Sequence, residues 1–195
     1  MANGEFRAIY TSDGALPARF EIADMEHPPG NHYTHYRLIV GEGRPGVVAV
    51  ARRGDAVLMV RQHRPSIGAD LWEFPRGSSE VVDAEAAGGS IADDYPDDYA
   101  DATLIRAGLR ELLEETGYAG EDARVIGRYF ADTSVFPQRL GVILCSVPDD
   151  AAAEPTDGEV DEVRWIARAE LMRMVGEGRI LDAHTLAAIG LLAAA

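Results

Sequence analysis

The segment from Arg110 to Tyr118 reads RELLEETGY and carries three glutamates within five residues. On a helix, Glu111 and Glu115 are four residues apart and share a face, with Glu114 beside them. Stacking like charges in this way costs a helix about 0.2–0.5 kcal/mol per pair. A bound hard cation would offset this cost, because Mg²⁺ prefers carboxylate oxygens. The segment therefore indicates either a divalent-metal site or a solvated acidic helix face on which Arg110 pairs with Glu114.

Apolar residues extend this helix toward the N-terminus. They recur at helical spacing, at Leu104, Ile105, Gly108, Leu109, Leu112 and Leu113. Asp101 or Thr103 would cap the start of the helix, and Gly117 stands where a C-terminal stop belongs. The pattern predicts one amphipathic helix in the centre of the chain.

Short β-branched and alternating runs lie on both sides of this helix. We expect strands at Phe6–Tyr10, Arg19–Ala23, Tyr33–Val40, Val47–Ala51, Val57–Val60, Arg124–Phe130, Leu140–Val147 and Val160–Ile166. The fourth and fifth would form a hairpin, and two helices, near Arg168–Val175 and Ala183–Leu192, would follow the last strand. Strands before and after one strong helix predict an α/β (α+β) fold, with the helix packed on a mixed sheet.

Composition excludes several classes of protein. The net charge of −15 argues against nucleic acid as a partner, because binding to a phosphate backbone needs many basic contacts. The apolar stretch Leu186–Ala195 is far shorter than the roughly 20 residues of a membrane span. Cys145, the single cysteine, is expected to be a buried strand thiol, and no secretory signal is visible. We expect a soluble, cytoplasmic protein.

Two further motifs accompany the glutamate helix. The segment from Arg110 to Tyr118 resembles the second half of the Nudix signature, Gx5Ex7REUxEExGU, in which U is a bulky apolar residue. Upstream, Val57–Pro65 (VLMVRQHRP) and Leu71–Gly77 (LWEFPRG) resemble the ADP-ribose pyrophosphatase branch of that family. The resemblance implies a Nudix α/β/α sandwich over residues 45–195. It also implies an N-terminal β-rich extension over residues 1–44 that builds a homodimer.

The resemblance implies a set of metal ligands. Glu111 and Glu115 would be the main ligands of Mg²⁺ (or Mn²⁺), with Glu114 supporting them and the backbone carbonyl of Arg76 adding a further ligand. Arg110 would hold the glutamates by ion pairing.

The resemblance also implies substrate-binding residues and a general base. Arg64, and less directly Arg61, would meet a substrate phosphate, although each could simply be a surface arginine at a strand end. Glu73 joins this set, and Phe136 could stack on a base or ribose. Glu159 is our choice of general base from a crowded acidic region that also holds Glu154, Asp157, Asp161 and Glu162.

The sequence departs from the family pattern in two places. The pattern places 13 residues between its glycine and its arginine, whereas 32 lie between Gly77 and Arg110, which predicts an insertion over about 78–101. Ala102 occupies the position of the intermediate glutamate, and Asp83, Glu85 or Asp101 could replace it. In addition, the segment at 131–138 (ADTSVFPQ) stands where the branch usually has a Ser-Pro-Gly-type loop, which leaves other nucleoside diphosphate sugars open as substrates.

These observations favour a metal-dependent hydrolase that cuts the diphosphate linkage of ADP-ribose or a related nucleoside diphosphate sugar. The products would be a nucleoside monophosphate and a sugar phosphate. One alternative is a non-catalytic regulatory module that binds a nucleotide ligand on the same fold, which the interrupted signature favours. Another is an enzyme acting on nucleoside triphosphates, which the motifs around Arg64 and Glu73 disfavour.

Overall fold

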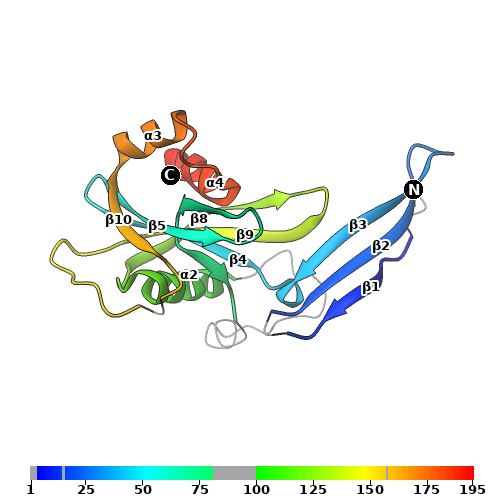
Figure 1. Ribbon diagram of the computed structural model, residues 1–195, viewed down its shortest axis with the longest axis horizontal. Coiled ribbons are helices and arrows are strands. Elements are labelled where there is room, and N and C mark those ends of the chain that lie inside the picture. Colours follow the sequence, from blue (N-terminus) through cyan, green and yellow to red (C-terminus); the bar gives the residue numbers. More distant parts are fainter. Residues whose placement is uncertain (1–3, 15, 81–99, 157) are drawn as a thin grey trace.

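The computed structural model describes residues 4–14, 16–80, 100–156 and 158–195. Its N-terminal part is a three-stranded antiparallel sheet in the order β1 (Arg7–Ser12), β2 (Ala18–Glu26) and β3 (His32–Val40). This N-terminal sheet projects from the rest of the molecule (Figure 1). A short 3₁₀ turn, η1 (Gly41–Gly43), leads from it into the second sheet.

The second sheet has seven strands and is mixed. Its main path runs β10 (Glu162–Ala167), β5 (Ala56–Arg64), β4 (Gly46–Arg53), β9 (Phe136–Ser146) and β8 (Glu121–Asp132). The short strands β6 (Ala69–Glu73) and β7 (Arg76–Ser78) pair with β5 and β4. Only β4 and β9 are parallel to each other within the described part of the chain.

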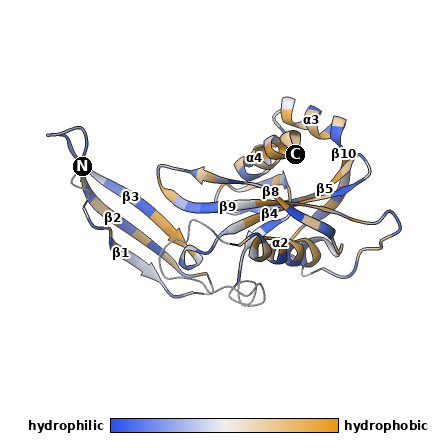
Figure 2. Ribbon diagram, turned by 180° about the vertical axis from the view of Figure 1, so that it is seen from behind, coloured by the Kyte–Doolittle hydropathy of each residue, from blue (hydrophilic) through white to orange (hydrophobic). Residues whose placement is uncertain are grey.

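Helices cover both faces of this mixed sheet. Helix α2 (Asp101–Thr116) packs on one face, while α3 (Arg168–Gly176) and α4 (Ala183–Ala194) pack on the other (Figure 1). Alternation along β4 explains the two layers, because Val47 and Ala49 join the core against α2 while Val48 and Val50 join the core against α3 and α4. Figure 2 shows hydrophobic residues concentrated on these central strands. The predicted α/β/α sandwich on a mixed sheet is confirmed.

Helix α2 ends as predicted but begins differently. Gly117 takes the left-handed conformation, with φ of 72°, and its amide donates to the Leu113 carbonyl. The predicted side-chain cap is wrong: Ala100 is the N-cap residue and makes no side-chain hydrogen bond. Asp101 is already helical, and its carboxylate pairs with Arg128 on β8 at 2.5 Å. Because Ala100 holds the cap position, Asp101 stands in the first turn, and its carboxylate pairs with β8 instead of capping the helix.

The remaining strands agree with the predicted positions, and most are longer than predicted. Strand β5 continues to Arg64, β9 begins at Phe136 and β8 spans Glu121–Asp132, because pairing partners extend each of them beyond its apolar run. Cys145 is buried on β9 as expected, and burial raises the pKa of its thiol to about 12. Most of the predicted insertion, including Asp83 and Glu85, lies outside the described residues.

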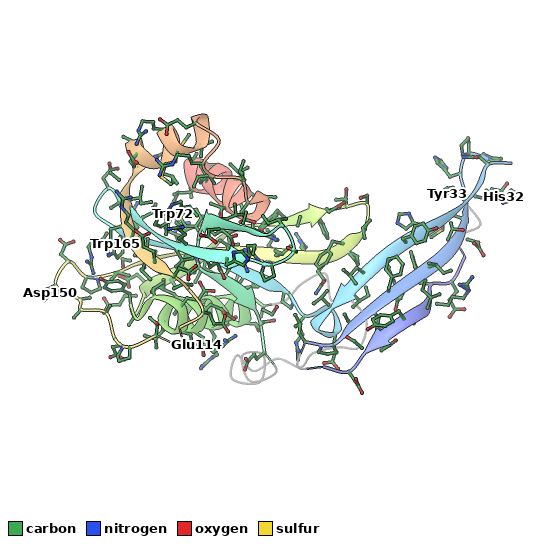
Figure 3. All side chains as sticks on the ribbon, in the orientation of Figure 1. His32, Tyr33, Trp72, Glu114, Asp150 and Trp165 are labelled. Carbon is green, nitrogen blue, oxygen red and sulfur yellow. The ribbon has the colours of Figure 1, made fainter. Side chains whose placement is uncertain are left out.

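Side chains join the N-terminal sheet to the larger one. The amide of Gln138 on β9 donates to the carbonyls of Val40 at 2.6 Å and Arg44 at 3.1 Å. Within the N-terminal sheet, Phe20 and Tyr36 stack with ring centroids 5.8 Å apart. Tyr33 lies near the far tip of this sheet (Figure 3) and is 44% exposed. A bilayer-spanning segment would need a longer apolar helix than any found in the described ranges.

Candidate metal and substrate site

Two carboxylates on one face of α2 meet the short strand β7. Glu115 is only 4% exposed, and the carboxylate of Glu111 lies directly against Gly77. Any side chain at position 77 would overlap that carboxylate. The four-residue spacing read from the sequence therefore does place Glu111 and Glu115 side by side, and it places them in a buried position rather than on a solvated face.

Burial strongly perturbs both acids. Removal from water raises the pKa of Glu115 to about 8, and the neighbouring charge of Glu111 contributes, against the stabilising backbone amide of Arg76. Burial likewise raises the pKa of Glu111 to about 7, with Arg110 opposing the shift. Because burial raises the pKa of each carboxylate and Glu111 also raises that of Glu115, the charged form of the pair depends on positive charge placed next to it.

Glu115 has an orphaned oxygen, which tests whether a cation would fit. Its Oε2 atom is fully buried and has no hydrogen-bond partner within the described residues. A buried acceptor with no donor is costly unless something outside the chain satisfies it. A divalent cation does this directly, so the residues present fit a metal ion.

The candidate centre consists of a pair of carboxylates rather than a full cage. Across the described residues, no three histidine, cysteine, aspartate or glutamate side chains converge as a ready-formed metal site. A pair is nevertheless what Mg²⁺ commonly uses, since it binds through one or two carboxylates and completes its shell with waters and substrate phosphates. Glu114 is 46% exposed and pairs with Arg110, and Figure 3 labels it beside α2. Its role as a ligand, like that of the Arg76 carbonyl, stays a prediction.

Arg110 organises the acidic end of the helix. Its guanidinium lies 2.8 Å from Glu114, 3.1 Å from Glu111 and 3.8 Å from Glu80, and it donates to the Ser78 carbonyl at 2.9 Å. It therefore ties α2 to the end of β7, in agreement with the ion pairing expected from the sequence. Glu80 joins this cluster from a part of the chain to which the sequence assigned no role.

Glu73 is a buried anchor for two arginines. Its carboxylate has no exposed surface and accepts from Arg64 at 2.5 and 2.9 Å and from Arg76 at 3.0 Å. The hydrogen bond that Arg64 donates to Glu73 raises the pKa of Arg64, and the charge of Glu115 acts in the same direction. Arg64 and Arg76 are thus held beside the carboxylate pair.

Arg61 has different surroundings from Arg64. Its guanidinium pairs with Asp70 at 2.7 Å and with Glu162 at 3.7 Å, toward the edge strand β10. Residues three apart on a strand point to opposite faces. The structure therefore brings Arg64, and not Arg61, to the glutamates.

A cavity of about 170 Å³ lies next to Gly77. Its lining includes Arg44, Arg76, Phe136, Gln138 and His184. Phe136, chosen from the sequence as a stacking residue, is thus in a hollow beside the carboxylate pair.

The start of α4 supplies residues that sequence reasoning missed. Asp182 caps α4 by accepting from the Thr185 amide and hydroxyl, each at 2.8 Å, and the same hydroxyl accepts from the Phe74 amide at 3.1 Å. His184 follows and lies 2.7 Å from the Tyr129 hydroxyl. Burial and the charge of Arg76 lower the pKa of His184, which therefore stays neutral near pH 7. The sequence located the start of this helix at Ala183 but assigned no role to Asp182, His184 or Thr185.

The other acidic residues proposed from the sequence differ in how near they lie to Glu111 and Glu115. The charge of Glu159 reaches Glu111 and raises its pKa, so the loop before β10 approaches the carboxylate pair. The loop is fastened there by the Glu154 amide, which donates to Gly117 at 2.8 Å. Asp101 lies ten residues before Glu111 on the same helix, about 15 Å along its axis, and cannot share a metal with it. Asp157 lies outside the described residues.

The amino-acid sequence is similar to a known family and to characterised and uncharacterised members of it. The family model described as NUDIX domain matches residues 43–188. The chain is 29% identical over 124 residues to an ADP-sugar pyrophosphatase of Mus musculus, covering 60% of this chain and 48% of that protein. It is 30% identical over 142 residues to an uncharacterized Nudix hydrolase, NudL, of Klebsiella pneumoniae, covering 72% and 70%.

Solved structures also resemble this fold. The crystal structure of an ADP compounds hydrolase matches with a TM-score of 0.68 at 16% identity, covering 96% of this chain and 89% of that one. At this low sequence identity, the match shows that the two proteins share a fold. The aligned region of the chain spans about half the length, 48%, of the mouse relative.

Proposed function

Because the chain belongs to the NUDIX domain family, we propose that it hydrolyses the diphosphate linkage of ADP-ribose or a related nucleoside diphosphate sugar. The products are a nucleoside monophosphate and a sugar phosphate. The names of the mouse relative, an ADP-sugar pyrophosphatase, and of the structural neighbour, an ADP compounds hydrolase, support this substrate class. Arg64, Arg76 and the Phe136 cavity beside the carboxylates support it as well.

One observation carries the proposal: a buried glutamate, Glu115, with an unpartnered oxygen and a partly buried one, Glu111, both with raised pKa values, stand beside two arginines. A protein that used this helix only for packing would gain stability from apolar residues at positions 111 and 115. Strongly perturbed acids in a cleft are typical of functional sites. We infer that Glu111 and Glu115 hold Mg²⁺, with Mn²⁺ as a substitute.

In the proposed reaction, different residues bind the metal, bind a phosphate and accept a proton. A cation held by Glu111 and Glu115 would supply positive charge to the phosphate oxygens and would lower the pKa of a water molecule. Arg64, aligned by Glu73, binds a phosphate through its remaining donors. The oxygen of the attacking water forms a bond to phosphorus while the bond from phosphorus to the bridging oxygen breaks. Glu159 accepts the proton of that water.

The substrate's second half occupies the cavity next to Gly77 in this proposal. Phe136 offers an aromatic face to a base or a sugar, and neutral His184 offers a ring nitrogen for hydrogen bonding. Arg44 and Arg76 add positive charge to the same hollow. Arginines in a chain of net charge −15 that gather here favour an anionic ligand.

Incubation with Mg²⁺ and a panel of nucleoside diphosphate sugars tests the proposal. We expect ADP-ribose or a close relative to give a nucleoside monophosphate, with turnover lost on chelation and reduced at least about 10²-fold in Glu115→Gln. Leu113→Gln, on the exposed side of the same helix, serves as the matched control and should retain activity. The alternative, a non-catalytic binding module, predicts saturable binding of the same compounds without any product.

We also propose that residues 1–44 form an extension that pairs two copies of the chain. Its outer strand β1 is exposed along most of its length, and Ile9 and Tyr10 are 54% and 63% exposed. Exposed apolar side chains on an unpaired sheet edge favour association with another protein surface. A second copy of this chain is the partner that the family resemblance implies.

A further inference from the structure

A second cavity lies away from the candidate site. It encloses about 490 Å³, a volume suited to a small-molecule ligand. Its walls come from the β4–β5 turn, the start of β8, the end of β9, the first residue of α3 and the last residues of α4. Figure 1 shows the C-terminal end of α4 close to α3 and far from the N-terminal sheet.

The cavity is separate from the carboxylate pair. Gly77 pairs with Val47 near the start of β4, whereas Arg52 lines the cavity near the end of the same strand. Five residues of strand separate these positions by about 17 Å. The two places therefore lie at different ends of β4 and have different lining residues.

Three arginines converge on this cavity from different elements. Arg52 comes from β4, Arg124 from β8 and Arg168 from the first turn of α3, and all three are exposed. None of them has an ion pair with any described residue. In a chain with 33 acidic and 18 basic residues, a hollow whose lining holds more arginines than acids differs from the rest of the molecule in charge.

The start of α3 strengthens this positive character. Ala167 is the N-cap and makes no side-chain hydrogen bond, and the acid in the first turn, Glu170, is already paired with Arg173 at 2.6 Å. The Arg168 amide donates to the Asp55 carbonyl at 3.0 Å, which fixes the β4–β5 turn against this helix end. The arginines and the helix terminus therefore act on the same volume.

Two acids also line the cavity and narrow the class of ligand. Asp55 and Asp122 face it, so the formal charge of the side chains is 3 − 2 = +1. A bare anion would leave these carboxylates without donors, whereas a ligand with hydroxyl groups would donate to them. The cavity thus offers guanidinium donors for a phosphate and carboxylate acceptors for hydroxyls.

We propose that this cavity is a second binding site, which takes a phosphate monoester that also carries hydroxyl groups, such as a sugar phosphate. Arg52, Arg124 and Arg168 bind the phosphate, and Asp55 and Asp122 accept hydrogen bonds from the hydroxyls. The site stands independently of the hydrolase reaction proposed above, because it shares no residue with the carboxylate pair.

Calorimetric titration with ribose 5-phosphate in the presence of a chelator tests this site without contribution from bound metal. We expect saturable binding with a dissociation constant on the order of 1 mM or tighter. Ribose should not bind, and inorganic phosphate should bind more weakly than ribose 5-phosphate. Arg52→Gln and Arg168→Gln should each weaken binding about 10-fold. Arg106→Gln, at an exposed position on α2, is the matched control and should change nothing.

Three results would overturn the proposal: no saturation up to about 10 mM ligand, equal weakening in the Arg106 control, or loss of binding in Glu115→Gln. Amide chemical shifts of the unsubstituted protein supply a second measurement that needs no variant. Ribose 5-phosphate should shift the amides of Gly54, Asp122 and Arg168. Shifts confined to the surroundings of Gly77 would place the ligand in the other cavity and refute the second site.

Discussion

Gly77 on β7 lies directly against the carboxylate of Glu111 on α2, 34 residues further along the chain. A Cβ atom at position 77 would overlap the Cδ and both oxygens of Glu111. The glycine is therefore required by the close approach of two elements, since its backbone is not in the left-handed region. This contact fixes where the carboxylate can stand.

Gly77→Ala should displace Glu111 and impair metal binding without unfolding the protein. A displacement of about 1 Å at a catalytic group can cost about 10²-fold in rate, and we expect kcat to fall by that order. Mg²⁺ titration of activity should show a weaker apparent affinity. Gly190→Ala, where nothing lies within 4 Å of the added methyl, is the control and should behave as the unsubstituted protein. Unchanged kcat and Mg²⁺ affinity in Gly77→Ala would contradict the contact.

The metal-free protein should lose stability as pH rises. The folded protein holds protons on Glu111 and Glu115 up to about pH 7 and 8, whereas the unfolded chain releases them near the ordinary value of 4.5. The folded state therefore binds more protons between these values, and this pair's contribution is complete below 4.5 and lost as pH passes 7 to 8. Thermal unfolding with a chelator, between about pH 5 and 9, measures this effect.

Two comparisons isolate the contribution of the glutamates to that pH dependence. The double variant Glu111→Gln/Glu115→Gln should show a flatter dependence of unfolding temperature on pH. Adding Mg²⁺ at high pH should restore stability to the unsubstituted protein and not to the double variant. Identical pH profiles for the two proteins would show that the acids are not perturbed as the structure indicates.

Arg64 and Arg61 should differ in their effect on the reaction. Arg64 lies within electrostatic reach of Glu115, whereas Arg61 pairs with Asp70 and Glu162. Arg64→Ala should lower kcat/KM by about 10- to 100-fold through the loss of charged hydrogen bonds to a phosphate. Arg61→Ala is the matched control and should stay within a few-fold of the unsubstituted protein. Steady-state kinetics with the best substrate measures both, and the reverse order of effects would count against the phosphate role of Arg64.

Asp182→Ala should destabilise the protein through the start of α4. The variant removes the acceptor for the amide and hydroxyl of Thr185, which is itself fully buried against Phe74. Loss of such a cap costs about 1–2 kcal/mol in the free energy of unfolding. Asp182→Asn keeps an accepting oxygen and should cost less. Urea denaturation measures both, and equal losses would argue that charge rather than capping matters here.

The protein should be a dimer with twice the 21.0 kDa mass of one chain. Ile9→Asp and Tyr10→Asp add charges to the exposed strand β1 and should shift the measured mass toward that of one chain. Met172→Asp, on the exposed side of α3 at 50% exposure, is the control and should leave the mass unchanged. Light scattering after size-exclusion chromatography gives the mass. A single-chain mass for the unsubstituted protein would refute the proposed pairing.

The sequence by itself determined the elements whose signal is local and periodic. The 3.6-residue spacing of apolar side chains located α2, and Gly117 marked its end. Alternation and β-branched runs located the β4–β5 hairpin, and the separated motifs identified the NUDIX family, which the family model confirms. The spacing of Glu111 and Glu115 was sufficient to predict that they share a face, because a helix fixes that relationship without help from any other element.

Only the tertiary structure decided which side chains meet across elements. Glu73 is buried where both Arg64 and Arg76 pair with it, and Asp101, in the first turn of α2, pairs with Arg128 on β8. His184 and Tyr129, 55 residues apart, meet beside Arg76 through the packing of α4 on β8. Such contacts depend on strand faces, register and helix placement, all of which are set by the packing of the whole core rather than by neighbours in the chain.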